Sequence, residues 1–88
     1  MIVYHRTDRS SADQILATQA WISRENSNEI YFSTVAVDSA ADGYGTVVLA
    51  VDIHPDLASL DDEFPDGEQH YRIHTRDLAG LPVAEIKG

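Results

Sequence analysis

The 88-residue sequence contains no cysteine, and this absence removes several kinds of chemistry from consideration. Without cysteine the chain can form no disulfide, no thiolate zinc site and no cysteine-nucleophile active site. The sequence also lacks an apolar run long enough for a membrane span or a signal peptide. We therefore expect a soluble cytoplasmic protein without membrane contact. The four histidines have no clear metal-ligand spacing, so no metal site is expected either.

Positive charge is also scarce. Six Lys and Arg residues face fifteen Asp and Glu residues, which gives a net charge of -9. The segment 25–71 holds eleven of the acidic residues and contains no lysine or arginine. A field of this sign repels phosphate backbones, so direct nucleic-acid binding is not expected. The charge favours a basic protein partner, or it serves only to keep a small protein soluble.

The apolar residues that are present are sufficient for one small core. Ile, Leu, Val and Phe make up a quarter of the chain, above the roughly 20% below which chains tend to stay disordered. A chain of this length is too short for two cores. Residues 1–88 are therefore expected to form a single minimal domain.

The pattern along the chain predicts strands with a few short helices. Five segments have the composition of strands or extended chain: 2–5, 30–33, 46–53, 68–75 and 81–86. A helix is expected after the cap candidates Asp8, Ser10 and Ser11, and a second one at 35–42, which ends at Gly43.

The continuous apolar run within 46–53 predicts a strand covered on both faces at the centre of the sheet. The acidic stretch 56–68, with a proline and a glycine, predicts a long surface loop. The fold class expected is α+β, with a small mixed sheet and two short helices.

Several short blocks occur in an order that resembles the ADP-ribosyltransferase superfamily. They are Tyr4-His5-Arg6-Thr7, Tyr31-Phe32-Ser33-Thr34, Ala40-Ala41-Asp42-Gly43-Tyr44, the strand 47–52 and an acid near Glu68. The superfamily includes diphtheria-toxin-like transferases, poly(ADP-ribose) polymerases and RNA 2′-phosphotransferases, and the resemblance covers about residues 2–74. It implies a sheet that is split around a cleft for NAD.

The resemblance also implies roles for single residues. His5 would hydrogen-bond the nicotinamide ribose, and the backbone of Arg6 would pair with the carboxamide. Phe32 and Tyr44 would sandwich the nicotinamide ring, and Ser33 would donate to the carboxamide oxygen. Arg6 stands where the family block has glycine, so its side chain has to point away from the ligand.

Two further residues complete the expected NAD-binding set. Thr7 belongs to the same block as His5, and Arg9 near the start of the first helix is a candidate for the pyrophosphate.

The resemblance places the catalytic acid at Glu68, with His5 and His70 as the other candidate catalytic residues. A fixed carboxylate would stabilise the oxocarbenium-like state formed as nicotinamide leaves. Glu68 and His70 share one face of a strand by the period of two, so either could occupy the acid's position. If His70 held that position, the domain would bind NAD without cleaving it.

The favoured function is therefore transfer of ADP-ribose from NAD to a macromolecular acceptor, most simply a protein side chain. The alternative is a non-catalytic acidic inhibitor whose stretch 25–68 covers a basic partner surface. Transfer of an RNA 2′-phosphate ranks last, because the chain between residues 25 and 71 lacks the basic residues that RNA binding requires.

Overall fold

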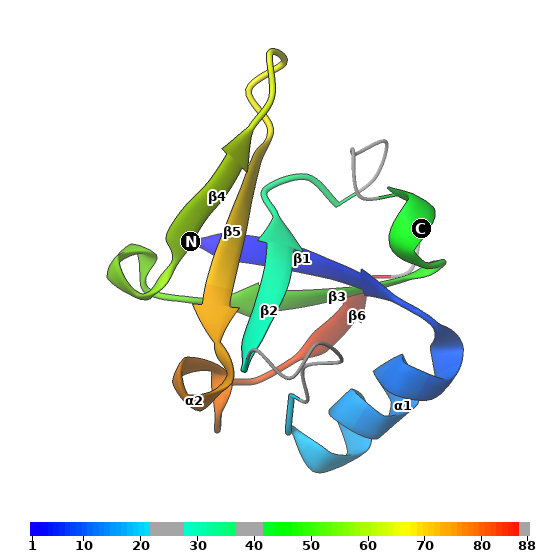
Figure 1. Cartoon of the computed structure of the whole chain (residues 1–88). Helices are drawn as coiled ribbons and strands as arrows, with labels where there is room; N and C mark the ends of the chain where they lie inside the picture. The colour runs from blue at the N-terminus through cyan, green and yellow to red at the C-terminus, as the bar shows by residue number, and fades with distance from the viewer. Residues whose placement is uncertain (22–27, 37–41, 87–88) are drawn as a thin grey trace.

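The structure is a computed structural model that describes residues 1–21, 28–36 and 42–86. It confirms an α+β domain in which one sheet is accompanied by two short helices (Figure 1). The six strands are β1 (Ile2–Thr7), β2 (Glu29–Ser33), β3 (Val47–Asp52), β4 (Ser59–Glu63), β5 (Gln69–His74) and β6 (Ala84–Ile86). The helices are α1 (Arg9–Thr18) and α2 (Thr75–Leu78), and two 3-10 turns are η1 (Asp42–Tyr44) and η2 (Pro55–Leu57).

The sheet has the strand order β4-β5-β2-β1-β3-β6, and each neighbouring pair in this order is antiparallel. The prediction of a mixed sheet was therefore wrong, because no pair of neighbouring strands in the described residues is parallel. Strands β1 and β2 are paired at a single position, Tyr4 opposite Ser33. The sheet thus consists of two three-stranded halves, β4-β5-β2 and β1-β3-β6, and in Figure 1 their strands run in clearly different directions.

Strand β3 is covered on both faces, as its apolar run predicted. Val47, Val48, Leu49 and Val51 are all buried. Its predicted place at the centre of the sheet was wrong, however, since β3 lies between β1 and the short edge strand β6. A continuous apolar run reports that both faces are covered, and says nothing about how many strands lie on either side.

The predicted loop at 56–68 was also wrong, because it contains η2 and strand β4. Strand β4 pairs with β5 on one side only, and all five of its residues are exposed. An edge strand without a buried face shows no apolar alternation, so its sequence resembles that of a loop. A tight turn closes this hairpin, where the Gly67 amide donates to the Phe64 carbonyl at 3.0 Å and Gly67 adopts a φ of 96°.

Helix α1 follows β1 directly and begins at one of the predicted caps. The Asp8 carboxylate accepts the Ser11 amide at 2.7 Å, and the helix ends at Gln19 in the left-handed conformation. Ala12 and Ile15 are its buried residues. The helix expected after the cap candidates is therefore confirmed.

The second predicted helix, at 35–42, falls largely on residues 37–41, which lie outside the described part of the chain. Of its remaining residues, Val35 and Ala36 are not helical, and Asp42 begins η1. The second helix of the structure is α2, which follows β5 and is capped by the His74 imidazole accepting the Arg76 amide.

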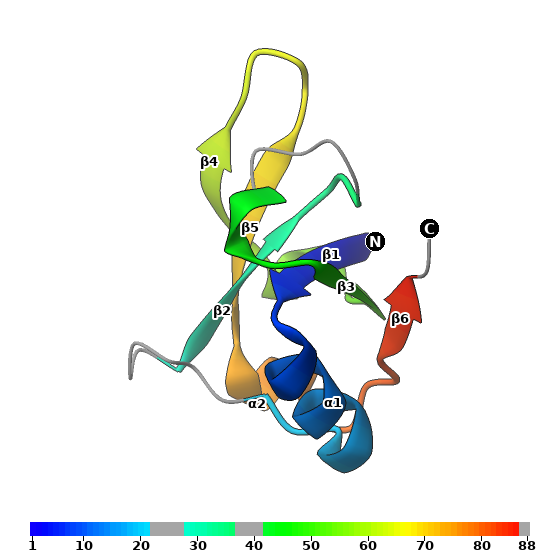
Figure 2. The ribbon, with the colours of Figure 1, turned by 90° about the vertical axis from the view of Figure 1, so that its right-hand side faces the viewer.

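The core lies between the sheet and α1, and it continues to α2. Its largest fully buried side chains are Phe32, Leu49, Ile73, Leu78, Val3 and Val51. Both helices lie at one end of the molecule, opposite the turn of the β4–β5 hairpin (Figures 1 and 2). In the described residues, no helix has the length and apolar character needed to cross a membrane.

Candidate functional site

A cavity of about 760 Å³ is lined by residues from both halves of the sheet and from α1. This volume lies within the range of small-molecule sites. The lining residues are Tyr4, His5, Arg6, Thr7, Ser11, Gln14, Ile15, Ala20, Trp21, Glu29, Ile30, Tyr31, Phe32, Ser33, Tyr44, Asp61, Asp62, Phe64 and His70. Six of the predicted NAD-binding residues are among them: His5, Arg6, Thr7, Phe32, Ser33 and Tyr44.

A hydrogen-bond chain of three side chains lies at this cavity. The Ser33 hydroxyl donates to Oε2 of Glu68 at 2.7 Å, and Nε2 of His70 contacts the same oxygen at 2.6 Å. The Val35 amide in turn donates to the Ser33 hydroxyl at 3.0 Å. The serine thus donates to the carboxylate and not to the imidazole, so the group lacks the serine-to-histidine bond of a serine hydrolase.

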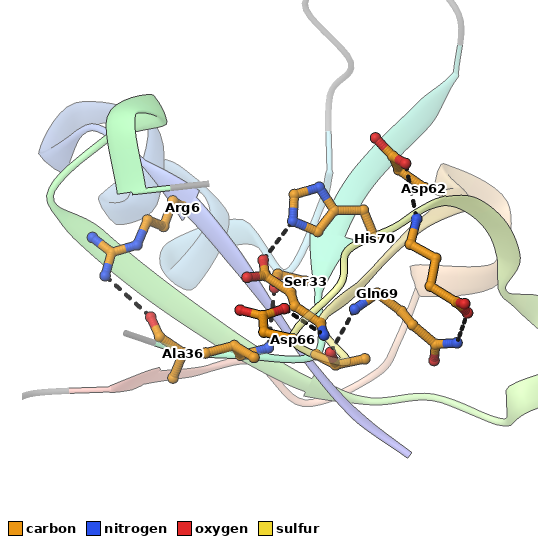
Figure 3. Close-up of polar contacts among 11 residues, drawn as sticks. Arg6, Ser33, Ala36, Asp62, Asp66, Gln69 and His70 are labelled. Carbon is orange, nitrogen blue, oxygen red and sulfur yellow. Dashed lines mark hydrogen bonds and ion pairs between the residues drawn. The ribbon is translucent and has the colours of Figure 1, made fainter. Parts of the chain in front are cut away.

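The strand register brings these residues together. Ser33 of β2 lies directly opposite His70 of β5, and Figure 3 shows the two side chains converging from these strands. Glu68 immediately precedes β5, and its backbone amide donates to the Asp66 carboxylate at 3.0 Å.

The adjoining backbone is fixed as well. The Thr34 amide donates to the Gln69 carbonyl, while the Gln69 amide donates to the Thr34 hydroxyl, both at 3.0 Å. Glu68 therefore stands in a position that several independent contacts define.

Glu68 and His70 occupy different depths at this site. The Glu68 side chain is 3% exposed and the His70 side chain 17%. His70 lines the cavity, whereas Glu68 lies behind it. The imidazole ring also packs against Phe64, with ring centroids 4.7 Å apart. The sequence left open which of the two residues faces the cleft, and in the structure they form one bonded pair with the imidazole on the cavity side.

His5 lies in an aromatic cluster on the wall formed by β1 and β2. Its ring meets Trp21 edge-on at 5.4 Å and Phe32 at 5.6 Å between centroids. Its Nδ1 lies 2.8 Å from the Tyr31 carbonyl oxygen, which can only accept, so Nδ1 carries the proton of this bond. The orientation of the imidazole is thus fixed by a backbone contact and by two rings. Phe32 is 2% exposed, so this predicted ring partner serves as a core residue at the same time.

Arg6 contacts the connection between β2 and β3 at two points. Its guanidinium donates to the carbonyls of Gly45 and Ala36, each at 3.1 Å, and the second contact is drawn in Figure 3. These contacts hold the Arg6 side chain against backbone carbonyls, while Arg6 still lines the cavity.

Tyr44 is set beside Arg6 by a close backbone contact. A Cβ added at Gly45 would lie 2.3 Å from the Thr7 carbonyl oxygen, so only glycine allows this approach. Tyr44 itself is 79% exposed. As it stands it is a surface ring at the edge of the cavity, and it has no aromatic partner among the described residues.

Arg9 is not among the residues that line the cavity. Its guanidinium forms two hydrogen bonds with Glu85 of β6, at 3.0 and 2.7 Å, and a further one with Asp13 at 2.9 Å. These hydrogen bonds, chiefly the one to Glu85, raise the pKa of Arg9 further above its ordinary value. The residue ties α1 to β6 and is engaged there, which leaves the predicted contact with a pyrophosphate without support.

The charge at the cavity is predominantly negative. Among the lining residues that the structure describes, Arg6 is the one Lys or Arg, against Glu29, Asp61 and Asp62. Arg72 compensates part of this charge from outside the lining, at 3.9 Å from Glu29 and 3.4 Å from Asp61. A field of this sign favours a cationic group in the cavity over a phosphate.

Trp21, Phe64 and Asp62 are among the lining residues that were not singled out from the sequence as site residues. Trp21 is the single tryptophan of the chain and is 6% exposed. Its position in the cavity depends on the packing of the segment after α1 against β1 and β2, for which the sequence carries no local signal. Phe64 and Asp62 arrive with the β4–β5 hairpin, which was predicted to be a loop.

No group of three or more metal-ligating side chains is found in the part of the chain that the structure describes. Comparison of the chain with protein-family models, with curated protein sequences and with solved structures finds no match.

Proposed function

We propose that the cavity binds NAD, and that the domain releases nicotinamide and transfers ADP-ribose to a protein acceptor. The observation that carries this proposal is a buried carboxylate, Glu68, hydrogen-bonded to Ser33 and His70 beside an aromatic cavity. The motif resemblance suggests the reaction, and the cavity beside Glu68 supports a binding site for its substrate.

The cavity suits the nicotinamide end of NAD in three respects. It offers the exposed ring of Tyr44 at its edge, and a positively charged ring is attracted to such a face. Its negative field acts in the same direction. His5 lines the cavity and is held in one orientation, which supports its assignment to a ribose hydroxyl.

Glu68 has the attributes of a group that stabilises developing positive charge. Burial places the carboxylate in a region of low dielectric, where its interaction with a cationic ribose is stronger than in water. Its two hydrogen bonds fix it in advance of the reaction. When nicotinamide leaves with the electron pair of the glycosidic bond, the ribose becomes cationic within the field of this carboxylate.

The pyrophosphate is served less well by side chains. Arg6 is the one candidate cation in the described lining, and its guanidinium already donates to two carbonyls. We therefore expect the phosphates to project toward solvent at the Arg6 rim and to contribute little affinity, so that NAD binds in the high micromolar to millimolar range.

The direct test follows nicotinamide release from NAD by wild-type protein, Glu68→Gln and Glu63→Gln. Glu63 lies nearby on the exposed strand β4, so its substitution changes the net charge equally without touching the buried chain. Wild type and Glu63→Gln should release nicotinamide, and Glu68→Gln should lose at least about 100-fold of the rate. Equal rates for all three proteins would contradict the proposal.

A second candidate function is favoured by strand β4. It is a fully exposed edge strand with Asp61, Asp62 and Glu63 in succession, which suits a basic partner. It also carries the features that protect edge strands from pairing, namely charge and a register shift between Leu60 and Asp62.

Because Asp61 and Asp62 line the cavity, Glu63→Lys is the cleaner probe of this alternative. If the protein is an inhibitor, this substitution should abolish its binding to the basic partner and leave NAD binding unchanged.

A further inference from the structure

We propose that His70, oriented by Glu68, is the general base that deprotonates the acceptor, and that the acceptor is a hydroxyl group carried by a basic segment. This inference rests on the proposed function and names the chemical class of its second substrate.

Glu68 holds His70 in one tautomer. Nε2 of His70 lies 2.6 Å from Oε2 of Glu68, which also accepts the Ser33 hydroxyl. A carboxylate oxygen can only accept, so Nε2 carries the proton and Nδ1 presents a lone pair. A buried carboxylate that holds an imidazole in this way fixes its tautomer and stabilises the imidazolium that forms when the base takes up a proton.

His70 is more accessible from the cavity than Glu68 is. The imidazole lines the cavity and is 17% exposed, whereas the Glu68 side chain is 3% exposed, so a molecule in the cavity can contact the histidine while the carboxylate acts on it as a nearby charge. The ring is supported on its side by Phe64, and the strand pairing places it opposite Ser33. The orientation of the imidazole is thus fixed by its hydrogen bond to Glu68 and by its contact with the Phe64 ring.

A general base and a negative surface together favour one class of acceptor. A carboxylate acceptor has no proton to lose and needs no base, whereas a hydroxyl does. In the described part of the chain, acidic groups near His70 include Glu68, its cross-strand neighbour Asp62, and Asp61 on the same strand as Asp62, whose charge Arg72 compensates in part at 3.4 Å. This negative surface repels an acidic acceptor and attracts one with Lys or Arg beside its hydroxyl.

The reaction balances without a further reagent. The acceptor O–H proton moves to Nδ1 of His70, and the acceptor oxygen bonds to C1′ of the ribose. The bond from C1′ to the nicotinamide nitrogen breaks, and its electron pair leaves on nicotinamide. The imidazolium then returns the proton to water.

The test supplies NAD together with one of three peptides that share a Lys- and Arg-rich sequence and differ at one central position, Ser, Glu or Ala. Transfer is measured by the mass of the modified peptide, and NAD hydrolysis is measured in the same tube by nicotinamide release. Wild type should modify the Ser peptide at least 10-fold faster than the Glu peptide. In His70→Asn the ratio of transfer to hydrolysis should fall at least about 30-fold.

The pH dependence gives a readout that a purely structural role would not move. A general base acts in its unprotonated form, so in wild type the ratio of transfer to hydrolysis should rise with pH, and in His70→Asn this rise should be absent. If His70→Asn does not fold, the wild-type profile alone decides, and a flat ratio between pH 5 and 9 overturns the inference. His70→Gln serves as the second variant.

Failure of the inference and failure of the proposed function look different. Wild-type protein that hydrolyses NAD but modifies the Glu peptide as fast as the Ser peptide, or modifies neither, overturns the inference alone. Equal loss of transfer and hydrolysis in His70→Asn also overturns it. Wild-type protein that neither binds nor hydrolyses NAD overturns both.

Discussion

Replacing Ser33 by alanine should destabilise the protein far more than the loss of one hydroxyl on a surface would. The hydroxyl is the donor to Glu68 and the acceptor of the Val35 amide, and Ser33 is 3% exposed. The substitution removes a hydrogen bond to a buried carboxylate, worth about 1.5–3 kcal/mol, and leaves a partly buried amide without its partner. Together we expect a loss of about 2–4 kcal/mol in the free energy of unfolding.

For a domain of this length, such a loss corresponds to a fall in Tm of roughly 10–25 °C. Urea unfolding followed by the fluorescence of Trp21 measures the free energy, since the single tryptophan lies in the same cavity. Ser59→Ala is the matched control, because Ser59 is a strand serine on the exposed edge, and it should change stability by less than about 0.5 kcal/mol. If Ser33→Ala is as stable as Ser59→Ala, the hydrogen-bond chain does not hold Glu68 as described.

Three further predictions concern the frame of the site. Gly45→Ala would place a Cβ 2.3 Å from the Thr7 carbonyl and should cost about 1–3 kcal/mol by urea unfolding, whereas Gly43→Ala, with no atom within 4 Å of its added Cβ, should cost much less. Leu49→Ala empties a fully buried position in β3 and should cost about 2–5 kcal/mol, against less than about 1 kcal/mol for the 43% exposed Leu57. Phe64→Ala removes the ring beside His70 and should slow transfer to the Ser peptide, as measured by the mass of the modified peptide at saturating NAD, and an unchanged rate of transfer would show that this ring does not position the imidazole.

The elements that could be predicted from sequence are those with a local pattern of apolar or capping residues. The run from Val47 to Val51 announced a strand covered on both faces, and Asp8 was among the caps expected for α1. Strand β4 could not be found in this way, because an edge strand with five exposed residues has the composition of a loop. Its existence is decided by backbone pairing with β5, and the sequence of β4 alone does not record that pairing.

The candidate site was predictable in its residue types and only partly in its geometry. The period of two placed Glu68 and His70 on one face, and the structure joins them through a hydrogen bond. That Ser33 would donate to Glu68 depends on the register between β2 and β5, which are far apart in the sequence. Arg9 looked suitable for a phosphate because it begins a helix, yet a carboxylate of the last strand, Glu85, binds it instead.

The most direct test of the account is a map of NAD binding by the amide chemical shifts of the labelled protein. The account predicts that millimolar NAD shifts the amides of residues 4–7, 30–35 and 69–71, which line or adjoin the cavity, and leaves those of residues 54–58 and 76–79 in place. The fluorescence of Trp21 should change with the same affinity. An unchanged spectrum at millimolar NAD, or shifts confined to residues away from the cavity, would contradict the claim that this cavity is an NAD site.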